Sequence, residues 1–326
     1  MCAAGLLSLA ACMSSGSLPT VTADFETAAV FNRGDAADDA VVIPGNDGNF
    51  WIVGADKQFG LRVYDNEGAQ LLSLGTGRLN NVDAVRLNDG SFVVTASNRT
   101  TIAIDVFVGR PAGKTLDLKL ASSIPLDLVE PYGLCMARLA GETFVFVGDK
   151  SGTVEQWRLD GQLQAERQRV FEYDSQTEGC VVDTVTNRLY VGEEVTGIWV
   201  TDLATGQTSL FAAVDGRTLK ADVEGLDIYD NGEQRWLVAS SQGNNSFVLF
   251  DPADGSEQLR FRVDRNDEGT LDGVSDTDGV AVYSASLDGY PDGILVVQDG
   301  RNTHPRGNQN FKVIDWRKIE KQRIGQ

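Results

Sequence analysis

A short pattern of one polar residue followed by apolar residues recurs six times along this chain of 326 residues. The copies begin 44 to 54 residues apart, at Asp39, Asp83, Tyr132, Glu178, Glu224 and Asp278. This period is typical of four-stranded β-propeller blades. Short β-rich runs separated by turn residues fill the intervals, as at 180–183, 188–192, 197–201 and 207–212, and no long amphipathic helix intervenes. The repeat therefore predicts an all-β fold, a six-bladed β-propeller of four-stranded blades.

The last repeat holds only three candidate strands, at 279–283, 293–298 and 311–316. The unassigned segment 24–30 near the start of the chain can supply the missing outer strand. That strand would close the ring by pairing the two ends of the chain. We therefore expect one propeller domain over residues 21–326, preceded by a separate segment at 1–20.

The segment 1–20 has the pattern of an export signal followed by a short polar tether. Its apolar run is too short to span a bilayer. Leu9-Ala10-Ala11-Cys12 resembles a bacterial lipobox, so we expect an exported lipoprotein of the outer membrane or periplasm, anchored at Cys12. Membrane contact is expected only through this lipid. Ordinary secretion and a coincidental apolar start remain as alternatives.

Charge and residue usage exclude several function classes. The chain has 28 Lys and Arg against 47 Asp and Glu, a net charge of −19, which disfavours nucleic-acid binding because the phosphate backbone would be repelled. A single histidine, His304, leaves no His-rich zinc site and little room for a Ser/His/Asp triad. Cys135 and Cys180 occupy equivalent places in adjacent repeats, and both a disulfide and two buried free thiols are open for this pair.

Polar side chains gather at one predicted face of the propeller. In a blade the first strand lies nearest the axis and the second runs antiparallel to it, so the start of the first and the end of the second meet on one face. Blades 4 to 6 place mostly carboxylates there, and blades 1 to 3 add one cation each, Lys57, Arg99 and Lys150. Carboxylates can hold hard divalent cations, and Lys and Arg can bind phosphate oxygens. The alternative is a solvated turn face with scattered ion pairs.

Long blocks of the chain resemble the calcium-dependent β-propeller phytase family. The matching blocks include Asp38-Asp39, Asp56-Lys57, Ser97-Asn98-Arg99, Pro131-Tyr132-Gly133, Ser175-Gln176-Thr177-Glu178-Gly179, Asp222-Val223-Glu224-Gly225, Ser241-Gln242-Gly243, Asp276-Thr277-Asp278-Gly279 and Asn308-Gln309-Asn310-Phe311-Lys312. They run in order from about residue 35 to 317. The resemblance implies a 3-phytase-type phosphoric monoester hydrolase that acts on calcium-complexed inositol hexakisphosphate through a metal-activated water. A monomer is expected.

The resemblance also implies roles for individual residues. It implies calcium ligands on this polar face of the propeller, which we call the rim, at Asp38, Asp39, Tyr132, Glu178, Glu194, Asp222, Glu224, Gln242 and Asp278. Lys57, Arg99 and Lys150 are expected to bind substrate phosphate, and they join Tyr132, Glu178 and Glu194 as the catalytic set. Asp272 and Asp299 are expected to hold a separate structural calcium between loops.

Two other function classes remain. A propeller lactonase or esterase would need a histidine base and would leave the Lys57, Arg99 and Lys150 set without a purpose. A non-catalytic binding lipoprotein would keep the calcium carboxylates and release no phosphate. A phosphate-release assay separates these from a phytase.

Overall fold

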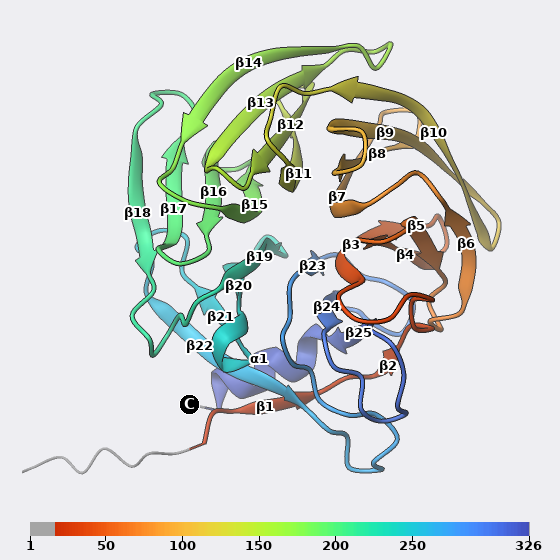
Figure 1. The fold of residues 1–326 in the computed structure, drawn as a ribbon. Coiled ribbons are helices and arrows are strands. Elements are labelled where there is room, and N and C mark those ends of the chain that lie inside the picture. The colour runs from red at the N-terminus through yellow and green to blue at the C-terminus, as the bar shows by residue number, and fades with distance from the viewer. Residues whose placement is uncertain (1–16, 326) are drawn as a thin grey trace, which may run out of the picture.

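The computed structural model describes residues 17–325, which form six β-sheets arranged in a ring (Figure 1). Of the predicted segment 1–20, residues 1–16, including Cys12, lie outside these described residues. The first strand of every blade lies nearest the axis, and the outermost strands form the outer edge of the disc. The sheet order therefore confirms the predicted six-bladed propeller.

The strand bounds of the blades follow in chain order. Blade 1 consists of β3 (Ala37–Pro44), β4 (Phe50–Asp56), β5 (Gly60–Tyr64) and β6 (Gln70–Leu74); blade 2 of β7 (Leu79–Arg86), β8 (Phe92–Asn98), β9 (Ala103–Ala112) and β10 (Thr115–Pro125). Blade 3 consists of β11 (Pro131–Leu139), β12 (Glu142–Asp149), β13 (Thr153–Leu159) and β14 (Ala165–Glu172); blade 4 of β15 (Thr177–Asp183), β16 (Arg188–Glu193), β17 (Gly197–Asp202) and β18 (Thr208–Ala213). Blade 5 consists of β19 (Val223–Asp230), β20 (Arg235–Ser241), β21 (Ser246–Phe250) and β22 (Glu257–Asp264), with the 3-10 turn η1 (Gln242–Asn244); blade 6 of β23 (Val280–Tyr283), β24 (Ile294–Asp299), β25 (Asn310–Asp315) and β2 (Phe25–Glu26).

The two ends of the chain close the ring together. β2 pairs antiparallel with β25 and completes blade 6, as predicted from the segment 24–30. Just before it, β1 (Thr20–Thr22) pairs parallel with β22 and adds a fifth strand to blade 5, a contact that the repeat did not predict. The N-terminal segment thus crosses from blade 5 to blade 6 and ties the two blades to each other (Figure 1).

The chain ends in one helix, α1 (Trp316–Ile324). The repeat predicts that Trp316 lies in the last strand, but β25 stops at Asp315, whose side chain accepts a hydrogen bond from the Arg317 amide and caps the helix. The indole of Trp316 stacks on the ring of Tyr229, with 3.7 Å between centroids. Within residues 17–325, the structure contains no helix with the length and hydrophobicity needed to cross a bilayer.

A β-bulge interrupts the first strand of five blades at the same place. Pairing with the second strand skips two residues in each: Asp38-Asp39, Asn80-Asn81, Tyr132-Gly133, Glu178-Gly179 and Glu224-Gly225. Bulges re-aim side chains, and here they mark where the polar residue of each repeat sits. The equivalent position in blade 1 is therefore Asp38 and in blade 2 Asn80, which corrects the repeat starts assigned to Asp39 and Asp83.

Glycine follows the polar residue in blades 3 to 6 because the next blade is too close for a side chain. A Cβ on Gly133 would lie 1.8 Å from the Glu178 carbonyl oxygen, and one on Gly179 would lie 2.0 Å from that of Glu224. Neighbouring first strands are also joined covalently by a disulfide between Cys135 of β11 and Cys180 of β15. This decides between the two states that the sequence left open for these cysteines.

Candidate active site

Three carboxylates form the acidic centre of the rim. Glu178 at the β15 bulge, Glu194 just after β16 and Glu224 at the β19 bulge each offer an oxygen, and these atoms lie within 4.8 Å of one another. Burial, reinforced by the charge of Glu178, raises the pKa of Glu194 to about 8 and raises that of Glu224 well above its ordinary value. The Gln176 amide donates a hydrogen bond to Glu194. Such a cluster is costly unless protons or a cation neutralise it.

A buried lysine stands beside this centre. Lys57, one residue past the end of β4, places Nζ 2.8 Å from an Asp278 oxygen, 3.4 Å from an Asp38 oxygen and 3.0 Å from an Asp35 oxygen. Burial alone would lower the pKa of Lys57, but the charges of Asp38 and Asp278 outweigh it and hold this pKa above its ordinary range. The amide of Gln242 donates to the second oxygen of Asp278 at 2.7 Å. Lys57 is therefore a permanent cation in an excess of carboxylates.

The donor set fits a hard metal ion. Both oxygens of Asp38, which is fully buried, and one oxygen of the buried Glu224 accept no hydrogen bond. Burial, with Glu178 and Asp278 adding repulsion, raises the pKa of Asp38 well above its ordinary value. Buried carboxylate oxygens that accept no hydrogen bond provide the environment in which oxygen-liganded divalent cations bind.

The other two predicted cations stand on the ring of Tyr132. Arg99 Cζ lies 5.3 Å and Lys150 Nζ lies 4.6 Å from the ring centroid, in cation–π contact. Arg99 also donates to Asn80 Oδ1 at 3.3 Å, and Asn80 Nδ2 donates to Glu178 at 3.0 Å. The cation pair and the acidic centre therefore belong to one connected site.

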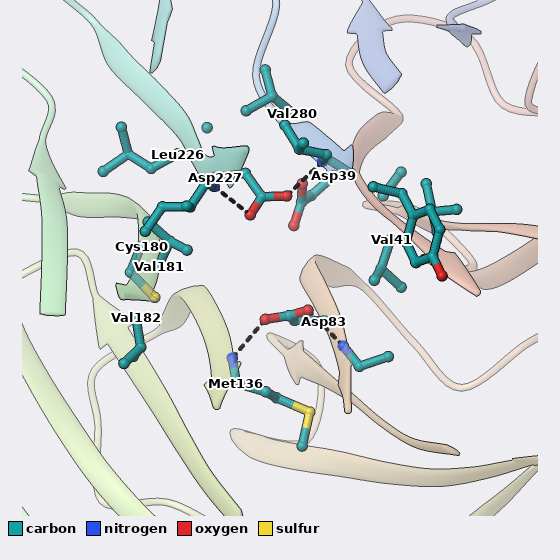
Figure 2. A pocket seen from close by; sticks show the side chains of 18 of the residues that line it. Asp39, Val41, Asp83, Met136, Cys180, Val181, Val182, Leu226, Asp227 and Val280 are labelled. Carbon is teal, nitrogen blue, oxygen red and sulfur yellow. Dashed lines mark hydrogen bonds between the residues drawn. The ribbon is translucent and has the colours of Figure 1, made fainter. Parts of the chain in front are cut away.

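Two predicted residues adjoin this site in different ways. The charge of Asp222 contributes to the raised pKa of Glu194, so its carboxylate lies beside the acidic centre. Asp39, by contrast, lines a pocket of about 500 Å³ between the first strands, where it accepts hydrogen bonds from the Asn81 side chain and the Val82 amide. Figure 2 shows it with Asp83 and Asp227 around this pocket. A metal role for Asp39 stays a prediction.

The predicted interloop pair is bridged by a lysine. Nζ of Lys312, a fully buried residue of β25, contacts a carboxylate oxygen of Asp272 and lies 2.8 Å from one of Asp299 and 2.9 Å from the Gly273 carbonyl oxygen. Glu26 of β2 lies 3.7 Å from the same ammonium. This cluster joins the strand that closes the ring to the segment between β22 and β23 and to the end of β24.

Comparison with known proteins agrees with this geometry. A family model described as phytase matches residues 1–326. A 3-phytase of Bacillus subtilis (strain 168) is 36% identical over 331 residues, covering 92% of this chain and 84% of that protein. The chain belongs to the phytase family. A crystal structure described as BBS1N in complex with ARL6DN has a TM-score of 0.53 at 11% identity, covering 91% of this chain and 98% of that one; this likeness concerns the fold alone.

Several residues of this phytase-family site were missed by the sequence reading. Asn80 was hidden because the repeat was aligned on Asp83, and the bulge pair Asn80-Asn81 before it was the available signal. Asp35 and Glu130 precede strands and follow no pattern that points to the rim. Asp149, beside Lys150, accepts hydrogen bonds within its own turn, from Ser151 among others.

Two buried carboxyl groups with raised pKa values, those of Asp83 and Asp227, lead us to expect that the stability of this phytase-family fold depends on pH. Each accepts a backbone amide hydrogen bond from the next blade, and burial raises the pKa of Asp83 to about 6 and that of Asp227 to about 7. A carboxyl group whose pKa is raised on folding stabilises the fold when protonated, and this contribution is lost as the pH rises through the folded-state pKa. In saturating calcium, stability should therefore fall between pH 4 and pH 7.

Asp227→Asn tests this expectation. The variant should flatten the pH dependence of the free energy of unfolding by roughly 2–4 kcal/mol, since one pKa unit corresponds to about 1.4 kcal/mol. Melting curves from pH 4 to pH 8 measure it, with Asp267→Asn on an exposed loop as control. A decline as steep as in the wild type would contradict the assignment.

Proposed function

We propose that this protein is a calcium-dependent phytase that releases inorganic phosphate and lower inositol phosphates from inositol hexakisphosphate. The observation that carries the proposal is a cluster of closely spaced carboxylates, with buried oxygens that accept no hydrogen bond, on the same rim as three cations. Family membership supports the reaction class, and the name of the Bacillus relative supports the substrate. The proposal includes a 3-phytase-type phosphoric monoester hydrolysis.

The carboxylates of the rim would hold calcium. The proposed ligands are Asp38, Tyr132, Glu178, Glu194, Asp222, Glu224, Gln242 and Asp278. Bound calcium supplies Lewis acidity to phosphate oxygens and lowers the pKa of the attacking water. Lys57 balances part of the rim's negative charge and contacts the phosphate that is cleaved, where its ammonium stabilises the charge that develops on the equatorial oxygens.

Arg99 and Lys150 would bind a second, neighbouring phosphate. They stand together on Tyr132, whereas Lys57 is held among Asp35, Asp38 and Asp278. Two groups of cations suit a substrate that carries adjacent phosphates, one at a cleavage site and one at an affinity site. We therefore expect a higher kcat/KM for inositol hexakisphosphate than for a simple phosphomonoester such as p-nitrophenyl phosphate.

The test is phosphate release from inositol hexakisphosphate in calcium by the wild type and by Glu178→Gln. Release by the wild type and its loss in the variant, with the fold intact, are the expected results. A non-catalytic binding lipoprotein would bind the substrate and release nothing. A lactonase or esterase would instead hydrolyse carboxylic esters.

The proposal has four further parts: export, a lipid anchor at Cys12, a monomeric state, and a calcium–phytate complex as the actual substrate. A substrate complexed with calcium answers a charge problem, because a protein of net charge −19 would repel free phytate. Labelling with a lipid precursor in a bacterial host, compared with Cys12→Ser, tests the anchor.

We also propose a second, structural calcium at Asp272 and Asp299, next to Lys312. Buried oxygens of Glu26, Asn302 and Asn310, without hydrogen-bond donors, support a further cation in this part of the chain. Two cations would then act at this place, the Lys312 ammonium and the proposed calcium ion. Their roles can be separated because calcium can be removed without changing the chain.

Melting curves across a calcium titration separate these roles. Lys312→Met should lower the free energy of unfolding by roughly 3–5 kcal/mol at every calcium concentration, because it leaves buried carboxylates without their partner. Asp299→Asn should in addition reduce the rise in melting temperature that calcium produces. If Asp299→Asn keeps the wild-type calcium response, Lys312 is the only cation at this place.

A further inference from the structure

Glu130 holds the two cations that stand on Tyr132. Its Oε1 accepts from Arg99 Nε at 2.6 Å and lies 2.5 Å from Arg99 Nη2 and 3.5 Å from Lys150 Nζ. Its side chain is 29% exposed, so it lies at the open edge of the site. Glu130 directly precedes β11, which starts at Pro131.

One carboxylate oxygen of Glu130 therefore contacts both cations to which the proposed function assigns phosphate binding. Two nitrogens of the Arg99 guanidinium and the ammonium of Lys150 all point to this one oxygen of Glu130. The same three donors would suit a phosphate oxygen equally well. A phosphate and the Glu130 carboxylate cannot both use these donors fully.

We propose that Glu130 is a positioning residue that keeps Arg99 and Lys150 in place between turnovers and is displaced by the incoming phosphate. The proposal rests on the function proposed above, in which these cations bind phosphate. By competing for the same donors, Glu130 weakens the binding of a single phosphate and speeds release of the product. A substrate with several phosphates overcomes the competition because its other contacts remain.

The experiment compares Glu130→Gln with Glu142→Gln. Both variants remove one negative charge from blade 3, but Glu142 begins β12, away from the rim, where it pairs with Arg158 at 3.0 Å. Binding of inorganic phosphate, measured by calorimetry in calcium without substrate, is the first readout. We expect Glu130→Gln to bind phosphate about two- to fivefold more tightly than the wild type, the range for losing one partly exposed ionic competitor. Glu142→Gln should bind it as the wild type does.

Kinetics supply the second readout. With inositol hexakisphosphate, Glu130→Gln should lower KM and kcat together, because tighter product binding slows release. Glu130→Asp keeps the charge and should return the phosphate affinity to near the wild-type value. In an Arg99→Ala background, Glu130→Gln should change phosphate affinity far less, since the shared donor is gone.

The outcomes separate this proposal from the proposed function. If the wild type hydrolyses inositol hexakisphosphate but Glu130→Gln binds phosphate equally or more weakly, Glu130 is not a competitor and the inference is wrong. If the wild type hydrolyses nothing, the proposed function fails, while the phosphate-binding comparison still decides whether Glu130 competes for Arg99 and Lys150. A melting curve of each variant confirms that the fold is retained.

Discussion

Lys57→Ala is expected to reduce kcat/KM for inositol hexakisphosphate by about 10²- to 10³-fold, the effect of removing one preorganised donor at a developing charge. Lys57 is the most buried of the three rim cations, with 7% of its side chain exposed against 15% for Arg99 and 36% for Lys150. Its effect should therefore be the largest, followed by Arg99→Ala and then Lys150→Ala. Steady-state phosphate release in saturating calcium measures all three.

Lys119→Ala is the matched control for these substitutions. Lys119 lies on the outer strand β10, exposed, and pairs with Asp117 at 2.8 Å. We expect it to leave the kinetics unchanged. Folded Lys57→Ala, Arg99→Ala and Lys150→Ala variants with wild-type kinetics would place the active site elsewhere on the propeller.

Removal of calcium is expected to abolish phosphate release and to lower the melting temperature. The reason is the acidic centre, where oxygens of Glu178, Glu194 and Glu224 lie within 4.8 Å of one another and burial opposes the charged forms of Glu194 and Glu224. An ion bound only by the folded state stabilises it by about 2.7 kcal/mol at a hundredfold excess over its Kd. Phosphate release and melting curves, with chelator and after calcium is restored, measure both effects.

Calcium acts on the enzyme and on the substrate, so the two effects need separate measurements. Melting curves without substrate report only binding to the protein, and Glu178→Gln should reduce the calcium-induced rise while Glu142→Gln keeps it. Full activity in excess chelator would rule out the metal mechanism.

The fold could be predicted largely from the repeat, because each blade repeats the same order of strands and turns. The closing strand followed from a missing element in the last blade, and β2 confirms it. β1 could not be predicted, since three residues that pair with the outer strand of blade 5 carry no periodic signal. The end of β25 at Asp315 could not be predicted either, because the apolar residues around Asp315 suggested a continuing strand and hid its role as the helix cap.

The candidate site was predicted in part. Repeat spacing and family resemblance together pointed to Lys57, Glu178 and Glu224, which the structure brings to one rim. The register of the first two blades was misread, because a bulge shifts which side chain faces the site and local polarity does not show the shift. Asn80 was missed for this reason.

The sequence by itself determined the number of blades, the face on which polar residues gather and the family. These properties follow from local patterns, strand period and turn chemistry, that every repeat carries within its own residues. Tertiary structure alone decided which anion pairs with which cation. Lys312 between Asp272 and Asp299, and Glu130 between Arg99 and Lys150, join residues of separate strands and loops. Charge pairing depends on distances of a few ångströms, and only the packing of separate strands and loops against one another sets them.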